Sequence, residues 1–268
     1  MFYQPRNIQE ALGLKAKLKE RGAFIAGGTD LVVLMNHGKA APENFIDLTH
    51  VPELCAIHRH NGTLELAGNV TYAQCGRLPI PCLAQASLSV GGPGIRELGT
   101  IAGNLATASP AGDGSTALLA LDAEVELTSI RGARRLSLEK FFLSYRKTAL
   151  APDELITKVF VPTGYRSAWA KNGKRGAMNI SVVAAAVALT PQNQARIALG
   201  SVAATPVRCH RAEEHLAQHG LGADAIRQAA ELVRGEIKPI TDHRASADYK
   251  IHLAGVLVRR LLEKLVRE

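Results

Sequence analysis

The stretch GTIAGNLATASPAGD, residues 99–113, is the part of the sequence that most constrains the fold. It lies within residues 91–114, which hold seven glycines and show little hydrophobic periodicity, a composition that predicts a long functional loop. Its small residues permit close backbone approach, and Thr100 and Asn104 add side-chain donors. Asp113 is suited either to accept a hydrogen bond from a ligand or to cap the helix that follows, and the sequence leaves both roles open.

A second glycine segment, AGGTDL at residues 26–31, lies far upstream of the first. A short strand is expected at residues 23–26, so Gly27-Gly28-Thr29-Asp30 forms a turn whose free backbone N–H groups suit phosphate, although such a pair is more often a plain turn. The apolar residues 31–35 are expected to be buried. Neither segment matches the Rossmann or P-loop motif. Two separate loops of small residues that cover a pyrophosphate from both sides favour an extended dinucleotide.

The rest of the sequence predicts alternating short helices and strands. Asn7 is placed to cap a first helix that ends before Gly22, and Asn61-Gly62 is typical of a type I′ hairpin turn. Composition changes after Thr163, which predicts a domain boundary there. The further elements expected are a short helix at 117–121, strands at 125–128, 155–161, 180–189 and 197–202, and an amphipathic helix at 246–267.

Composition narrows the classes of function. With 268 residues and 47% apolar content the chain can bury a substantial core, and no apolar run is long enough for a membrane span. The net charge of +8 comes from scattered basic residues with few aromatics, which argues against a nucleic-acid-binding module. The N-terminus lacks the features of a secretory signal, and the four cysteines lack the spacing of zinc sites, so free thiols and a cytoplasmic location are expected.

The two glycine segments together resemble those of the FAD subunits of the xanthine dehydrogenase and carbon monoxide dehydrogenase family of molybdenum hydroxylases. The resemblance continues through ALLALDAEVEL at 117–127, YRKTALAPDELI at 145–156, GKRGAMNISVVAAAVAL at 173–189 and ARIALGSVAATPVR at 195–208. It covers nearly the whole chain. It implies an α+β fold in which two subdomains of the PCMH, or vanillyl-alcohol-oxidase-like, type bind FAD and a C-terminal α+β domain follows. The expected division is 1–56, 57–163 and 164–268.

The resemblance also implies a set of FAD-contacting residues. Residues 25–31 and 100–104 are expected to hold the pyrophosphate and ribitol. Ser109 and Asp113 are expected to lie near the polar edges of the ribitol or flavin. Leu155 with Ile156, and the stretch Trp169 to Lys171, are expected to approach the isoalloxazine. The full expected set is Ile25, Ala26, Gly27, Gly28, Thr29, Asp30, Leu31, Thr100, Ile101, Ala102, Gly103, Asn104, Ser109, Asp113, Leu155, Ile156, Trp169 and Lys171.

Three departures from the family pattern are visible. Ala102 stands where the family usually has a glycine, which removes freedom at positive φ, and Glu97 replaces a frequent asparagine. The stretch between Tyr72 and Leu83 looks short, which puts its local helix in doubt. No cysteine-rich insertion is present, so the resemblance implies no iron–sulfur cluster in this chain.

The implied function is electron transfer within a multisubunit oxidoreductase. Electrons from a molybdenum centre would reach FAD through the iron–sulfur clusters of a partner subunit and leave to an acceptor, with NAD expected and ferredoxin, quinone or oxygen as alternatives. No catalytic acid, base, nucleophile or metal ligand is expected here: no histidines show HExxH spacing, and His58 and His60 are expected on one exposed strand face. A self-contained FAD oxidase and a cofactor-free basic binding module remain the alternatives.

Overall fold

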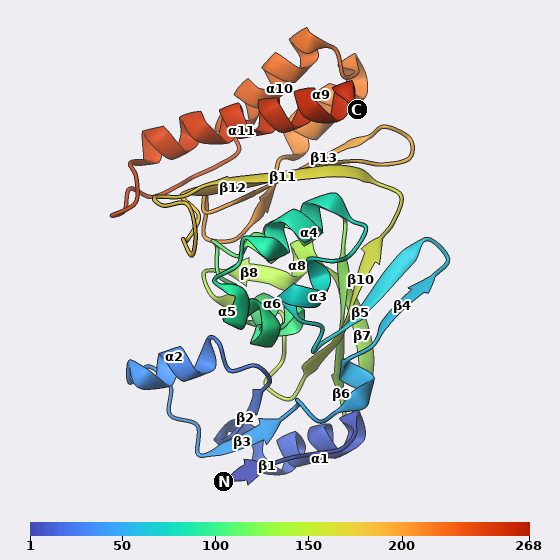
Figure 1. Ribbon diagram of the computed structural model, residues 1–268, viewed down its shortest axis with the longest axis vertical. Coiled ribbons are helices and arrows are strands. Elements are labelled where there is room, and N and C mark those ends of the chain that lie inside the picture. Colours follow the sequence, from blue (N-terminus) through green and yellow to red (C-terminus); the bar gives the residue numbers. More distant parts are fainter.

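A computed structural model describes all 268 residues and shows three structural layers stacked along the long axis of the molecule (Figure 1). None of its helices combines the length and apolar character that crossing a bilayer requires. The mixture of helices and sheets agrees with the α+β class predicted from the sequence.

The N-terminal layer is a small parallel sheet with strand order β1-β3-β2, flanked by one helix. The side chain of Asn7 accepts from the backbone N–H of Glu10 at 2.8 Å and begins α1, as predicted. The chain leaves β2 through the first glycine segment and enters α2. The elements are β1 (Phe2–Tyr3), α1 (Ile8–Leu18), β2 (Gly22–Ile25), α2 (Leu31–Asn36) and β3 (Asn44–Asp47).

The middle layer is an antiparallel sheet of order β4-β5-β10-β6-β7 with short helices on it. Asn61 and Gly62 both have positive φ between β4 and β5, which confirms the predicted hairpin. His58 and His60 are exposed on β4, also as predicted. The strands are β4 (Ile57–His60), β5 (Thr63–Ala67), β6 (Glu124–Ser129), β7 (Gly132–Ser137), β8 (Phe142–Ser144), β9 (Lys147–Thr148) and β10 (Leu155–Pro162). The helices are α3 (Tyr72–Cys75), α4 (Pro81–Leu88), α5 (Pro93–Leu98), α6 (Ile101–Thr107), α7 (Asp113–Ala120) and α8 (Leu138–Phe141).

The C-terminal layer is a four-stranded antiparallel sheet covered on one face by three helices (Figure 1). Ser246 accepts from the backbone N–H of Tyr249 and begins the long final helix at the predicted place. The elements are β11 (Arg166–Asn172), β12 (Val183–Leu189), β13 (Ala195–Gly200), β14 (Val207–Arg208), α9 (His210–His219), α10 (Ala223–Arg234) and α11 (Ala247–Arg267).

Strand β12 contributes side chains to two hydrophobic cores, one in the middle layer and one between the C-terminal sheet and its helices. Its residues are buried throughout, and because side chains alternate between the faces of a strand, Val183, Ala185, Val187 and Leu189 pack against the C-terminal helices. Ala186 and Ala188 face the other way and belong to the core of the middle layer. Helices α4 and α7 lie against that face. The small alanine side chains let these helices approach the sheet closely.

Two sequence predictions about elements are wrong. Residues 91–114 form α5, α6 and the start of α7 rather than a long loop, because most of the glycines lie at helix boundaries, such as Gly92 and Gly112 at N-cap positions. Residues 31–35 are not buried: they begin α2, in which no side chain is buried and Val32 and Val33 are 44% and 50% exposed. The doubted helical stretch between residues 72 and 83 contains α3 and the start of α4.

Candidate functional site

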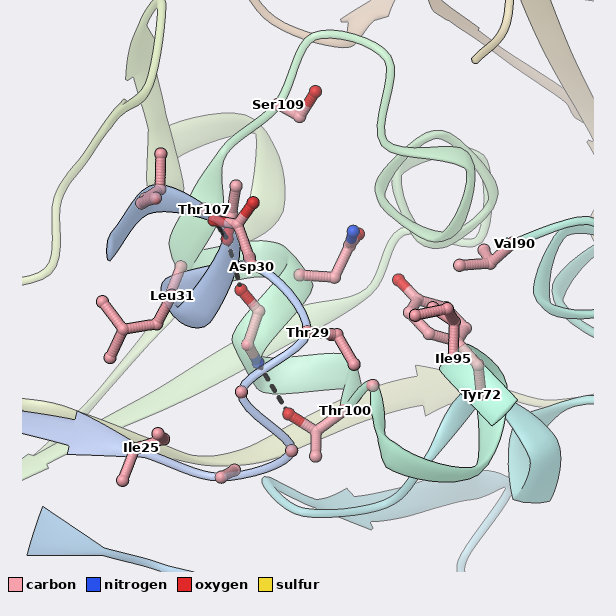
Figure 2. A pocket seen from close by; sticks show the side chains of 18 of the residues that line it. Ile25, Thr29, Asp30, Leu31, Tyr72, Val90, Ile95, Thr100, Thr107 and Ser109 are labelled. Carbon is pink, nitrogen blue, oxygen red and sulfur yellow. Dashed lines mark hydrogen bonds between the residues drawn. The ribbon is translucent and has the colours of Figure 1, made fainter. Parts of the chain in front are cut away.

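A cavity of about 670 Å³ lies where the two glycine segments meet. This volume is in the range typical of cofactor pockets. Every residue from Ile25 to Leu31 lines it, as do Thr100, Gly103, Asn104 and Ser109 from the second segment. Figure 2 shows the first segment running past Thr100, with Tyr72, Val90 and Ile95 grouped on another side of the cavity. The structure therefore brings most of the predicted pyrophosphate-binding residues to one cavity.

The two segments touch each other as well as the cavity. A Cβ atom on Gly27 would lie 1.7 Å from the carbonyl oxygen of Leu98, so only glycine allows this approach. A Cβ on Gly99 would lie 3.3 Å from Thr29 Oγ1. Asp30 Oδ2 accepts a hydrogen bond from Thr107 Oγ1 at 3.0 Å (Figure 2). The first segment is thus fixed against the end of α5 and on α6. Close approach explains Gly27, whereas Gly28 has the positive φ of a turn residue.

The second segment is held by its own hydrogen bonds. Thr100 Oγ1 accepts from the backbone N–H of Gly103 at 3.1 Å, which caps α6 and leaves the hydroxyl hydrogen free to donate. Asn104 Oδ1 accepts from Ser115 Oγ at 3.2 Å, so its amide N–H₂ group stays available. Ala102 lies in α6 without a positive φ, and its methyl group is accommodated there. Ile101 is fully buried in the core and does not line this cavity.

A smaller cavity of about 140 Å³ adjoins the larger one and shares Thr100, Gly103 and Ala106 with it. Leu155 and Ile156 line it, as does Ala102. Its wall also contains the buried Glu154, whose hydrogen-bonded ion pair with the exposed Arg134 at 2.6 Å lowers the pKa of this carboxyl group. The wall is otherwise mainly apolar, so this cavity suits a flat apolar ring system rather than a phosphate.

Asp113 and Lys171 form an ion pair of 2.7 Å between the middle and C-terminal layers. Their side chains are only 7% and 11% exposed. Asp113 also accepts from Ser181 Oγ at 2.6 Å and Ser89 Oγ at 3.1 Å. It does not cap its own helix, and it lines neither cavity. The hydrogen bond from Ser181 to Asp113 fixes Ser181, whose neighbour in the chain, Ile180, lines the larger cavity.

Trp169 packs against the middle core, and the Lys171 ammonium lies 5.8 Å from its ring centre. Neither residue lines the two cavities. The structure therefore does not bring the Trp169 to Lys171 stretch to the same cavity as Leu155 and Ile156.

Tyr72, Arg146 and Ile180 are among the residues lining the larger cavity that sequence reasoning missed. Arg146 lies at the β8–β9 turn with φ of 52°. Tyr72 follows Thr71, which forms an isolated β-bridge with Thr100, so pairing between distant segments brings it to the cavity. No local motif predicts such a pairing. In the sequence, only the Thr71 capping box with Gln74 indicates the start of α3.

Residues 1–164 match the family described as the FAD binding domain in molybdopterin dehydrogenase. This chain is a member of that family. Residues 168–265 match the CO dehydrogenase flavoprotein C-terminal domain, so the two family domains together account for nearly the whole chain. The resemblance stated from the sequence and the predicted fold, an FAD-binding domain followed by a C-terminal α+β domain, are both confirmed.

Relatives of this FAD-binding family member are subunits of oxidoreductases. The carbon monoxide dehydrogenase medium chain of Afipia carboxidovorans is 33% identical, over 98% of this chain and 95% of the relative. The nicotinate dehydrogenase FAD-subunit of Eubacterium barkeri is 34% identical, over 93% and 90%. The structure of reconstituted CO dehydrogenase from Oligotropha carboxidovorans has a TM-score of 0.94 at 30% identity and covers 100% of this chain and 98% of that chain.

Proposed function

We propose that this chain is the FAD-carrying electron-transfer subunit of a molybdenum hydroxylase complex, with NAD as the electron acceptor. Its partners would be an iron–sulfur subunit and a molybdopterin-binding large subunit, in a cytoplasmic assembly. When bound, FAD would collect electrons singly from iron–sulfur clusters and release them as a pair. The observation that carries the proposal is the contact of two glycine segments beside a cavity whose size suits the cofactor.

The chain's own residues would bind and orient the cofactor rather than perform chemistry. Backbone N–H groups near Gly27, with the Thr100 hydroxyl and the Asn104 amide, supply donors suited to a pyrophosphate. Leu155 and Ile156 supply apolar walls. The residues proposed to contact the cofactor are those of the predicted set that line a cavity, Ile25, Ala26, Gly27, Gly28, Thr29, Asp30, Leu31, Thr100, Ala102, Gly103, Asn104, Ser109, Leu155 and Ile156. The other predicted residues line neither cavity and would support the lining residues by packing behind them; these are Ile101, Asp113, Trp169 and Lys171.

We further propose the functional division 1–56, 57–163 and 164–268. The first two parts would each contribute one glycine segment, and the third would contribute Ile180 to the cavity. The four free thiols, three of them buried, suit the reducing cytoplasm.

The cavity lining favours a relay over a self-contained oxidase. An oxidase that acts on its own substrate needs a base near the reacting carbon. The only carboxylate that lines the larger cavity is Asp30, which already accepts from Thr107. In the smaller cavity, Glu154 is paired with Arg134. Neither carboxylate is poised to abstract a proton from a substrate.

The test uses the purified full-length chain. A yellow chain, or one that becomes yellow with FAD, is expected, and its flavin should stay oxidised when candidate small alcohols are added. After chemical reduction without oxygen, NAD⁺ should reoxidise the flavin faster than an oxidised ferredoxin or a quinone does. NADH absorbance should appear as the flavin is reoxidised by NAD⁺. Reduction by a small substrate would establish the oxidase alternative, and no FAD binding at all would refute the proposal.

A further inference from the structure

Tyr72 carries a hydroxyl group that is buried and has no hydrogen-bond partner in the protein. The side chain is only 2% exposed, yet it lines the larger cavity. An unmade hydrogen bond at a buried hydroxyl costs about 1–3 kcal/mol. Native structures keep such groups rarely, so a partner absent from the chain itself is the simplest reason for this one.

The position of this hydroxyl is fixed from several sides. The backbone N–H of Tyr72 donates to the carbonyl of Gly99 at 3.0 Å. A Cβ atom on Gly114 would lie 2.5 Å from Tyr72 Oη, and one on Gly99 would lie 3.7 Å from the ring. The two glycines thus leave the space that the phenol ring fills. A flip of the ring leaves Oη in the same place, so the donor is pre-organised.

The surroundings of Tyr72 Oη fit a ligand acceptor better than a protein one. In Figure 2 the hydroxyl points from α3 inward among the side chains that line the cavity, near Val90 and Ile95. Both neighbours are apolar and offer no acceptor, and the nearby Asp113 carboxylate accepts from Lys171, Ser181 and Ser89 but not from Tyr72. Burial, followed by the nearby Cys75 and Asp113, raises the pKa of Tyr72 well above its ordinary value, so the group stays a neutral phenol that can donate.

We propose that the Tyr72 hydroxyl donates a hydrogen bond to an acceptor atom of the bound FAD and so positions the cofactor in the larger cavity. This inference rests on the proposed function. It adds to the glycine segments a side-chain donor from α3, on a different side of the cavity from Gly27 to Leu31. Tyr72 is a positioning residue for the cofactor, not an acid or base.

The test compares Tyr72→Phe with Tyr165→Phe in the full-length chain. Phenylalanine keeps the ring and removes only the hydroxyl. Tyr165 is the matched control, because its hydroxyl donates to Asp122 at 3.3 Å and it lines neither cavity. Two quantities are measured for each variant: the melting temperature of the FAD-free chain and the Kd for FAD by titration.

The two variants should behave in opposite ways. Tyr72→Phe should raise the Kd for FAD about 3- to 10-fold, because one hydrogen bond is lost. Its FAD-free chain should melt no lower than the unmodified chain, since the hydroxyl has no partner to lose. Tyr165→Phe should lower the melting temperature and leave the Kd unchanged.

The outcomes separate this inference from the proposed function. An unmodified chain that binds FAD together with a Tyr72→Phe Kd within twofold of it would overturn the inference alone. A fall in the FAD-free melting temperature as large as that of Tyr165→Phe would also overturn it, since the hydroxyl would then have an internal partner. If the unmodified chain binds no FAD, both the proposed function and the inference fail.

Discussion

Substitution of Gly27 by alanine tests the contact between the two glycine segments. The added methyl carbon would lie 1.7 Å from the carbonyl oxygen of Leu98, where real contacts stay beyond 3.0 Å. The backbones must therefore separate by more than about 1 Å, and strain of this kind typically costs about 1–3 kcal/mol. If FAD binding has to restore the contact at that cost, the Kd for FAD should rise by about 5- to 150-fold.

A matched control lies in the neighbouring helix. A Cβ atom on Gly94 in α5 would have no other atom within 4 Å, and this glycine has no positive φ, so Gly94→Ala adds the same group without a clash. It should melt at the same or a higher temperature, because alanine is favoured over glycine in a helix by about 0.5–1 kcal/mol. FAD titration and thermal melting of both variants check this. If Gly27→Ala matched Gly94→Ala in both measurements, the argument from close approach would be refuted.

Three further predictions concern other parts of the chain. Lys171→Met leaves the Asp113 carboxylate buried without its counter-charge and should lower the free energy of unfolding by about 3–5 kcal/mol in urea melts; an unchanged midpoint would contradict a structural ion pair. Burial alone would raise the pKa of Asp242, but hydrogen bonds led by Lys250 hold it well below its ordinary value. Its charge therefore stabilises the fold fully above about pH 4 and loses this effect as pH falls further, so Asp242→Asn should destabilise the chain at pH 7 and less so below pH 4, whereas a gap independent of pH would speak against the pairing. Cys55 alone is exposed, and burial raises the pKa of the other three thiols, so a thiol reagent at pH 8 should modify one cysteine in the folded chain and four after denaturation; fast modification of more than one would show that the buried thiols are accessible.

Local signals in the sequence were sufficient for the elements whose ends are set by one residue. Asn7 and Ser246 cap helices by side-chain hydrogen bonds to nearby backbone N–H groups, and Asn61-Gly62 supplies the positive φ angles of a hairpin. These interactions span only a few residues, so the local sequence contains all that is needed to predict them.

One wrong prediction came from local helix signals that were outweighed, and the other arose where tertiary structure decides the outcome. Seven glycines suggested a loop at residues 91–114, but Pro93 at the start of α5 and the Thr100 cap of α6 were local helix signals that glycine content obscured. The apolar stretch after Asp30 suggested burial. In the structure Leu31 and Leu34 line the cavity while Val32 and Val33 face solvent.

The candidate site was predicted unevenly because contacts between distant segments of the chain decide part of its lining. Residues on the two glycine segments were found because small residues in sequence indicate close backbone approach. Tyr72 was missed because a β-bridge between Thr71 and Thr100 brings it there. Lys171 was assigned to the cofactor, while the structure shows its ammonium paired with Asp113 behind the wall.

The side chains of β12, which alternate between two cores, have a consequence for how the chain unfolds. Since Ala186 and Ala188 complete one core while Val187 and Leu189 complete the other, neither half can lose its packing and leave the other intact. Thr116 of α7 would meet a Cβ on Gly200 at 2.3 Å, so the halves are also tightly fitted beyond this strand. The chain should denature as one cooperative unit, and a fragment truncated near residue 164 would expose an apolar surface and aggregate.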